Sequence, residues 1–271
     1  MGAGLAEMTT NYRSFRPVSQ QEIAGDLRAF GLGRGDTVLV HSAMSRIGYV
    51  QGSAPAVVDA FLDVLGPEGM LVVPTFPFNG SMLAHVKSDP PFDVERTPSL
   101  MGAITEEVRC RPGARRSLEP THPVAAFGPQ AKFLTADHVN ASGACDEHSP
   151  LVRLTQVGGF VLLLGVDFRN CTLLHAAEEV ARVPFVDFET RYRLRGRDQG
   201  RDYLMTIYCH STPIRPNFPA IEPVLQQRGL LRTGRVGEAA CRLARASDIL
   251  DTALEHLARD PYFLRVRPRG G

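Results

Sequence analysis

The stretch "TVLVHS" at residues 37–42 decides the fold, because a similar run, "MLVVPTF", follows at residues 70–76. Both runs are short, rich in β-branched residues and apolar enough to be buried on both faces of a sheet. Residues 55–65 lie between them and carry apolar side chains at helical spacing. A strand, a helix and a second strand in this order predict a βαβ unit whose two strands are parallel.

The rest of the chain extends this unit into a larger sheet. A third buried run, "GFVLLLGV", occupies residues 159–166. Beyond residue 184 the pattern changes, and "FVDFETRYRLRG" and "YLMTIYCH" alternate apolar with polar residues, as antiparallel strands do. A helix near 219–228, a strand near 234–244 and a helix over 247–260 are expected to close the chain.

These patterns predict an α/β fold built as one domain over residues 18–262. Its central mixed sheet has a parallel βαβ N-terminal part and an antiparallel C-terminal part, with helices on both faces. Residues 1–17 are expected to form an N-terminal extension and residues 263–271 a tail.

Composition excludes several classes of function. The net charge of +1 leaves no long-range field to attract nucleic acid or an anionic membrane. No apolar run approaches the roughly 20 residues that span a bilayer, and the first residues contain no signal peptide. The 5 cysteines lack CxxC spacing, which argues against a disulfide framework or a structural zinc site. We therefore expect a cytoplasmic protein with no nucleic-acid partner, no membrane partner and no metal.

The segment "CTLLHAAEE" holds the first candidate for chemistry. A helix places i, i+3 and i+4 on one face, so His175 can meet Glu178 or Glu179. A carboxylate on one imidazole nitrogen fixes the tautomer and raises the basicity of the other nitrogen, as a general base requires. The alternative is a solvated ion pair on a helix surface. The helix begins at the carboxyl end of a buried strand, where open α/β sheets bind ligands, and this favours a site.

Other polar residues are expected at the same edge of the sheet. His41 ends the first strand, Ser42 opens the turn after it, and Thr75 ends the second strand. Backbone N–H groups of that turn could face an oxyanion or a thioester, whereas a histidine hydrogen-bonded in the core is the plainer interpretation of His41. His122, between prolines in "EPTHPV", sits on a stiff backbone and is either a positioned imidazole or a turn residue.

Weaker candidates lie in loops and on strands. The loop "CDEHSP" (145–150) gathers two carboxylates and a histidine, and "RRS" (115–117) could grip a phosphate or be solvated surface. Cys209 and His210 are a poor catalytic pair, because adjacent side chains on a strand point opposite ways. The chain has no GxSxG, HExxH, GxGxxG or Walker motif.

Taken in order, these motifs resemble those of the aminoglycoside 3-N-acetyltransferase family, coenzyme A-dependent N-acyltransferases distinct from the GNAT fold. The resemblance covers roughly residues 18–262 and rests on "VLVHSAMSRIGYVQG", "GMLVVPTF", "PPFDVERTPSLMG", "RPGARRSLEPTHPVAAFG", "CDEHSPLVRL", "VLLLGV" with "CTLLHAAEE", and "IEPVLQQRGLLRTGRVGEAACRLARASDIL". It implies acyl-CoA in a groove over the sheet edge and direct attack of a substrate amine on the thioester, with no acyl-enzyme.

The resemblance also implies roles for individual residues. The family's LHxAE motif makes His175 the general base and Glu178 its orienting carboxylate, and it gives Glu179 no part. His122 would line the site. The positions matched to the acyl-CoA side are His41, Ser42, Thr75, Arg116 and Ser117.

The acceptor implied by the resemblance is the 3-amino group of a 2-deoxystreptamine aminoglycoside, acetylated from acetyl-CoA as in antibiotic resistance. A polycation needs an acidic pocket, and the candidates on the substrate side are Asp93, Asp146, Glu147, His148 and Asp167. Around the substrate side of the site, the sequence departs from the family pattern at Ala43, Pro123 and His148.

Three alternatives stay open. One is an acyltransferase for a different amine in natural-product biosynthesis. Another is a metal-dependent hydrolase that uses His122, His148 and His175. The last is a non-catalytic acyl-CoA binder, against which the intact pair of His175 and Glu178 argues.

Overall fold

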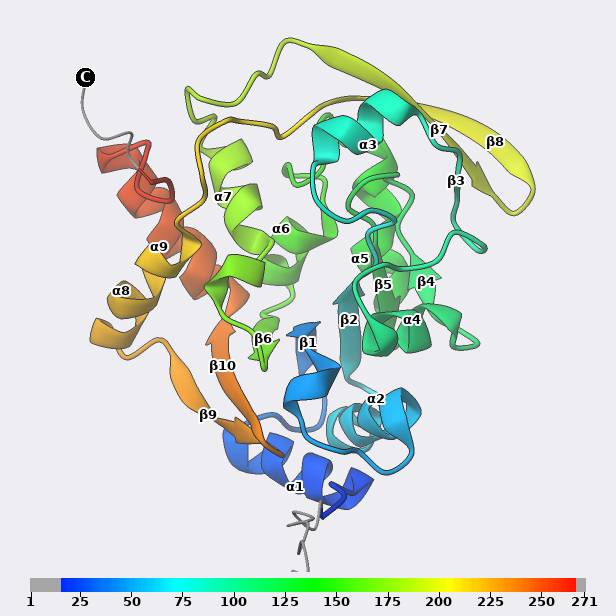
Figure 1. Cartoon of the computed structure of the whole chain (residues 1–271), viewed down its shortest axis with the longest axis vertical. Coiled ribbons are helices and arrows are strands. Elements are labelled where there is room, and N and C mark those ends of the chain that lie inside the picture. The colour runs from blue at the N-terminus through cyan, green and yellow to red at the C-terminus, as the bar shows by residue number, and fades with distance from the viewer. Residues whose placement is uncertain (1–15, 267–271) are drawn as a thin grey trace, which may run out of the picture.

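The computed structural model describes residues 16–266, and a seven-stranded sheet forms its centre (Figure 1). The three inner strands are parallel and the strands that flank them are antiparallel, which confirms the predicted mixed sheet. In spatial order the strands are β4 (Arg115–Arg116), β5 (Val124–Phe127), β2 (Met70–Pro74), β1 (Thr37–Ser42), β6 (Phe160–Leu164), β10 (Ala239–Arg245) and β9 (Arg232–Val236).

Helices cover both faces of this sheet, as predicted. Val38 and Val40 of β1 pack into the core on one face and Leu39 into the core on the other, because successive strand residues alternate. The first face carries α1 (Gln20–Phe30), α2 (Ser53–Leu65) and α4 (Ala103–Cys110). The second carries α5 (Ala131–Thr135), α6 (Pro150–Gln156), α7 (Leu173–Val180), α8 (Ile221–Gln227) and α9 (Ala246–Arg259).

Local chemistry sets the start and the end of α1. The Ser19 side chain accepts a hydrogen bond from the Glu22 amide at 3.2 Å, and the Glu22 carboxylate accepts one from the Ser19 amide at 2.9 Å. This reciprocal capping box satisfies amides that the first turn leaves free. The helix ends at Gly31, whose φ of 105° is accessible to glycine at little cost.

The C-terminal strands depart from the predicted arrangement. β7 (Arg191–Asp198) and β8 (Arg201–Tyr208) pair antiparallel as predicted, but with β3 (Phe92–Asp93) they form a separate three-stranded sheet (Figure 1). The single strand predicted near 234–244 is a hairpin of β9 and β10. The chain reverses there at Gly237, which has a φ of 54°.

Connecting segments contribute short helices around the sheet edge. The proline-rich segment 77–98 holds α3 (Met82–Ser88) as well as β3. Four 3₁₀ turns complete the described chain: η1 (Met44–Arg46), η2 (Ala136–Asn140), η3 (Phe168–Asn170) and η4 (Phe218–Ala220). Within residues 16–266, no helix combines the length and the apolar character needed to cross a membrane.

The buried core continues past residue 262, where the sequence predicts the domain to end. Leu264 is fully buried and Arg265 is 5% exposed, and a β-bridge joins Arg265 to Pro216. The C-terminal segment therefore belongs to the core as far as these residues. Most of the predicted extension, residues 1–15, and the end of the predicted tail, residues 267–271, lie outside the described residues.

Candidate functional site

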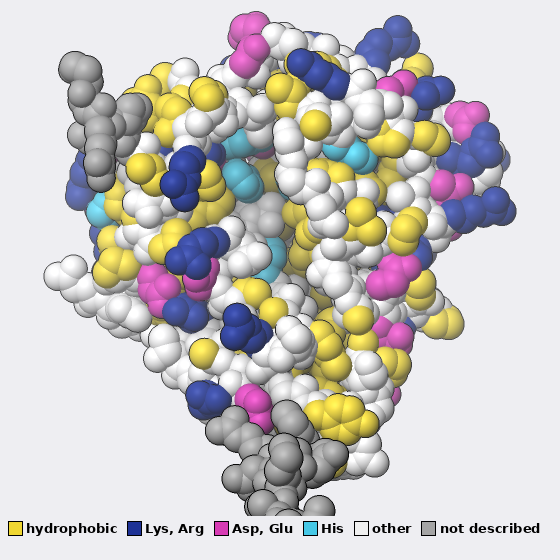
Figure 2. Space-filling model, in the orientation of Figure 1, with side chains coloured by type: hydrophobic (Ala, Val, Ile, Leu, Met, Phe, Trp, Pro, Cys, Tyr) yellow, Lys and Arg dark blue, Asp and Glu magenta, His cyan; other side chains and the backbone are white. Residues whose placement is uncertain are grey.

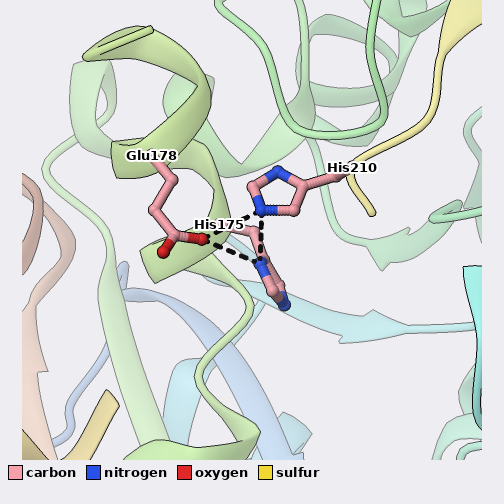
Figure 3. Close-up of side chains that lie close together, drawn as sticks. All are labelled: His175, Glu178 and His210. Carbon is pink, nitrogen blue, oxygen red and sulfur yellow. Dashed lines mark hydrogen bonds and ion pairs between the residues drawn. The ribbon is translucent and has the colours of Figure 1, made fainter. Parts of the chain in front are cut away.

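The site begins at α7, which carries His175 and Glu178 on one face. Nδ1 of His175 lies 3.3 Å from Oε2 of Glu178, and the other ring nitrogen, Nε2, is directed away from the carboxylate (Figure 3). Burial lowers the pKa of His175 below its ordinary value, although the hydrogen bond to Glu178 works in the opposite direction. His175 is therefore neutral at pH 7. With Nδ1 protonated toward Glu178, Nε2 carries the lone pair.

A second histidine, His210, completes the cluster from the end of the β7–β8 hairpin. Its Nε2 lies 2.9 Å from Oε2 of Glu178 and its Nδ1 lies 3.1 Å from Oε1 of Glu179. Burial alone would lower the pKa of His210, but the two carboxylates raise it to about 9. His210 is accordingly an imidazolium held between two carboxylates.

Sequence reasoning missed His210, which it considered only as a partner of Cys209. Both residues follow the end of β8 at Tyr208, and His210 faces the site without Cys209 (Figure 3). Tyr208 lies two residues before it, and its hydroxyl donates to Oε2 of Glu179 at 2.8 Å. Tyr208 and His210 thus reach the same carboxylate, and polar residues at alternate positions of "YCH" are the signal that could have found them.

Glu179, to which the resemblance gave no part, is a structural member of the cluster. It is 3% exposed and accepts hydrogen bonds from the Tyr208 hydroxyl and, at 3.1 Å, from the Cys145 amide. With its other oxygen it holds His210. The expectation that only the first glutamate of "HAAEE" matters is therefore corrected.

Arg265, which was expected in the tail, neutralises Glu178. Its Nε donates to Oε1 of Glu178 at 2.6 Å, its Nη2 donates to Oε2, and its Nη1 donates to the Ile214 carbonyl at 3.1 Å. Burial opposes ionisation of Glu178, but hydrogen bonds from His175, His210 and Arg265 hold its pKa below the usual range. Two carboxylates thus face two cations, Arg265 and His210, in a buried network of balanced charge.

Two cavities meet at His175. Phe78, Gly80, His122 and His175 line both of them, and Figure 2 shows histidine side chains along a groove in this face of the molecule. The first cavity, about 270 Å³, adds the residues His41, Ser42, Pro74, Phe76, Asn79, Met101, Thr105, Val166, Arg169, Asn170, Cys171, Thr172 and Phe218. The second cavity, about 380 Å³, adds Ser81, Met82, Cys145, His210, Ser211, Thr212, Pro213, Ile214, Arg215, Pro216 and Arg265.

His41 and Ser42 line the first cavity from the end of β1. His41 is 5% exposed, and its Nε2 has no hydrogen-bond partner among residues 16–266. Burial lowers the pKa of His41 to about 4, so this imidazole is neutral. The turn amide expected to face an oxyanion is occupied, because the Ala43 N–H donates to the Leu164 carbonyl at 2.9 Å.

Thr75, Arg116 and Ser117 lie beneath the site, and none of them lines either cavity. The Thr75 hydroxyl donates to the Pro123 carbonyl at 3.0 Å and accepts from Nε of Arg116 at 3.0 Å, which leaves it no proton for an oxyanion. The Ser117 hydroxyl binds Nδ1 of His138 at 2.9 Å. These side chains therefore support the segment that carries His122, and their contact with acyl-CoA stays a prediction.

His122 lies at the wall between the two cavities. Its ring packs 4.4 Å from that of Phe76, and its Nδ1 lies 3.0 Å from the Thr121 hydroxyl. The carboxylate of Glu119 accepts from that hydroxyl at 2.8 Å and from the His122 amide at 2.5 Å. Burial raises the pKa of Glu119 to about 7. Glu119 was missed because nothing in the sequence marks it as buried.

The residues expected to make the acceptor pocket acidic line neither cavity. Asp146 accepts hydrogen bonds from backbone amides of its own loop, Glu147 is exposed, and His148 binds Asp137 at 2.9 Å. Asp93 likewise accepts backbone amides, and Asp167 pairs with Arg169. Asp93, Asp146 and Asp167 thus stabilise their own loops, and the contact of the five residues with an acceptor stays a prediction.

The three-histidine metal site of the hydrolase alternative does not assemble either. His148 binds Asp137 and lines neither cavity, unlike His122 and His175. The described group whose ligand atoms lie close enough to share an ion is His175, Glu178 and His210, all within 4.8 Å (Figure 3). There the His210 imidazolium and Arg265 already neutralise Glu178, which disfavours a further cation.

Known proteins match both the sequence and the fold. Residues 39–258 match the family model described as aminoglycoside 3-N-acetyltransferase. The chain is 35% identical to aminoglycoside N(3)-acetyltransferase VII of Streptomyces paromomycinus, over 90% of this chain and 93% of that protein.

Solved structures support the same family assignment. AAC-IIIb in a binary complex with CoASH superposes with a TM-score of 0.80 at 27% identity, over 90% of this chain and 97% of that one. A histidine-to-alanine mutant of AAC(3)-IVa in complex with a gentamicin gives 0.80 at 28% identity, over 93% of each chain. The chain therefore belongs to the aminoglycoside 3-N-acetyltransferase family and is an N-acetyltransferase.

Proposed function

We propose that this chain transfers an acetyl group from coenzyme A to a primary amine, with Nε2 of His175 as the general base. One observation carries the proposal: His175 lines both cavities while Glu178 holds its Nδ1. A base at the junction of two cavities can reach an amine bound in one and a thioester bound in the other. Its lone pair then lies on the nitrogen that faces the substrates.

The first cavity suits the acyl-CoA. The Nε2 of His41 is buried without a partner, and such an atom gains a hydrogen bond when a polar ligand arrives. The Ser42 hydroxyl lines the same wall. The solved structure of the relative AAC-IIIb is a binary complex with CoASH, which supports the same co-substrate here.

The reaction then needs one attack and the relay of one proton through His175. The amine nitrogen attacks the thioester carbon, the new C–N bond forms, and the C–S bond breaks with its electron pair leaving on sulfur. Nε2 of His175 accepts the proton that the nitrogen loses and passes it to the thiolate. Glu178 stabilises the imidazolium formed in between. Proton transfer to a positioned base such as His175 typically contributes roughly 10²–10⁴-fold to the rate.

Two acceptor classes follow. Relatives act on aminoglycosides, so the 3-amino group of a 2-deoxystreptamine aminoglycoside is the first. A different amine is the second, and it is favoured by the absence of a carboxylate from both cavity walls among the described residues.

The test is release of the coenzyme A thiol from acetyl-CoA, measured with gentamicin and with simple primary amines. Thiol release should require an amine, yield the N-acetyl product and persist in the presence of a chelator. Release without any amine, or its loss on chelation, would instead support a hydrolase.

A further inference from the structure

The wall of the second cavity has an unusual charge for a family whose members act on polycations. Its lining within residues 16–266 includes two arginines, Arg215 and Arg265, and three histidines, but no aspartate or glutamate. An acceptor bound there meets positive or neutral side chains on every described side. An ammonium group beyond the one that reacts would have no counter-ion from this wall.

The carboxylates closest to this cavity are already occupied. Glu178 is fully buried and bound by Arg265, His210 and His175. Glu179 is bound by His210, by the Tyr208 hydroxyl and by a backbone amide. Neither lines the cavity, and a network of balanced charge offers no net attraction to a cationic ligand.

Arg215 differs from Arg265 because its guanidinium is available. Arg265 is buried and directs its nitrogens to Glu178 and to the Ile214 carbonyl. Arg215 is exposed, and its guanidinium makes no hydrogen bond or ion pair with another of the described residues. The backbone beneath it is held in place, since the Arg215 carbonyl accepts from the Val266 amide at 2.9 Å and the Ile214 carbonyl accepts from Arg265.

We propose that the acceptor is an amine that also carries an oxyanion, a carboxylate or a phosphate, and that Arg215 binds this oxyanion. The planar guanidinium presents paired N–H donors that match such groups. The Ser211 and Thr212 hydroxyls line the same cavity and add donors. The inference rests on the proposed function only for the identity of the reacting group, the amine.

Binding tests this charge preference without requiring turnover. Isothermal titration calorimetry on the coenzyme A-bound protein would compare 4-aminobutyrate, 4-aminobutanamide and 1,4-diaminobutane, which share an amine and a chain of similar length but end in an anion, a neutral amide and a cation. We expect affinity to fall in that order, by about tenfold to a hundredfold from carboxylate to amide, as expected for a charge-assisted hydrogen bond. Gentamicin should bind more weakly than 4-aminobutyrate.

Two variants separate the effect of the Arg215 side chain on binding from the effect of the protein's net charge. Arg215→Glu should reverse the order of the three ligands, whereas Arg193→Glu, an equal charge change at an exposed position of β7, should preserve it. The inference is overturned if the diamine or gentamicin binds as well as the carboxylate, if the carboxylate does not bind, or if Arg215→Glu leaves the order unchanged.

Turnover measured in parallel tests the proposed function independently. Rapid acetylation of gentamicin with no preference for anionic amines would overturn the acceptor inference and support the proposed function. An Arg215-dependent preference for the anion without acetylation of any amine would support the site and refute the proposed function.

Discussion

Replacing His210 by glutamine tests the charge network at the site. Glutamine keeps a polar side chain of similar reach but cannot become a cation. Glu178 and Glu179 would then share Arg265 as their remaining cation, so the network would carry a net negative charge. Removing one partner of a buried ion pair typically costs about 3–5 kcal/mol of unfolding free energy, because the other charge stays buried.

The dependence of this loss on pH follows from the pKa of His210. The pKa rises from 6.5 to about 9 on folding, so the folded state binds the proton more tightly than the unfolded state. A pKa difference of one corresponds to about 1.4 kcal/mol. The rise from 6.5 to about 9 therefore means that the charged His210 contributes about 3 kcal/mol to the free energy of unfolding. This contribution is complete below pH 6.5, decreases as the pH rises, and is lost above pH 9.

The assay is urea unfolding of both proteins at several pH values between 6 and 10. Because the chain has no tryptophan, circular dichroism is the appropriate signal. Buried thiols also weaken the fold at high pH, but they are the same in both proteins and cancel in the difference. The stability advantage of the wild type should shrink by about 3 kcal/mol across this interval. Curves that stay parallel would refute the assignment of His210 as a buried imidazolium.

Three further predictions concern the same region. Arg265→Met should cost about 3–5 kcal/mol of unfolding free energy, because it leaves two buried carboxylates facing the His210 imidazolium alone; urea unfolding checks this, and a loss below about 1 kcal/mol would contradict it. An NMR titration should place the pKa of His41 near 4 and that of His175 below 6.5, and a pKa above 7 for either would show that its environment is not apolar. Gly143→Ala should destabilise the fold by about 1–3 kcal/mol, since a Cβ there would lie 2.2 Å from the Tyr208 ring; an unchanged urea midpoint would refute this contact.

Local patterns in the sequence predict the parts of the fold and site that depend on neighbouring residues. The runs at 37–42 and 70–76 predict the parallel centre of the sheet, because each strand is buried on both faces. The pairing of His175 with Glu178 follows from their spacing on one helix turn. The separate sheet of β7 and β8 could not be predicted, because it depends on β3, a two-residue strand in a proline-rich segment.

Contacts between distant parts of the chain account for the rest. Arg265 binds Glu178 across 87 positions, and the Tyr208 hydroxyl reaches Glu179 across 29. The periodicity of the sequence does not indicate which side chains, far apart along the chain, come into contact. For the same reason, the sequence shows carboxylates such as Asp146 but not the backbone amides that they bind.

The most direct test of the central claim is kcat/KM for acetyl transfer by His175→Ala, measured by thiol release beside the wild type on the best acceptor found. Binding of coenzyme A, measured by calorimetry, serves as the control for folding. If Nε2 of His175 accepts the proton, kcat/KM should fall by roughly 10²–10⁴-fold while coenzyme A affinity stays within a few-fold of wild type. A kcat/KM close to the wild-type value would contradict the role of His175 as the base.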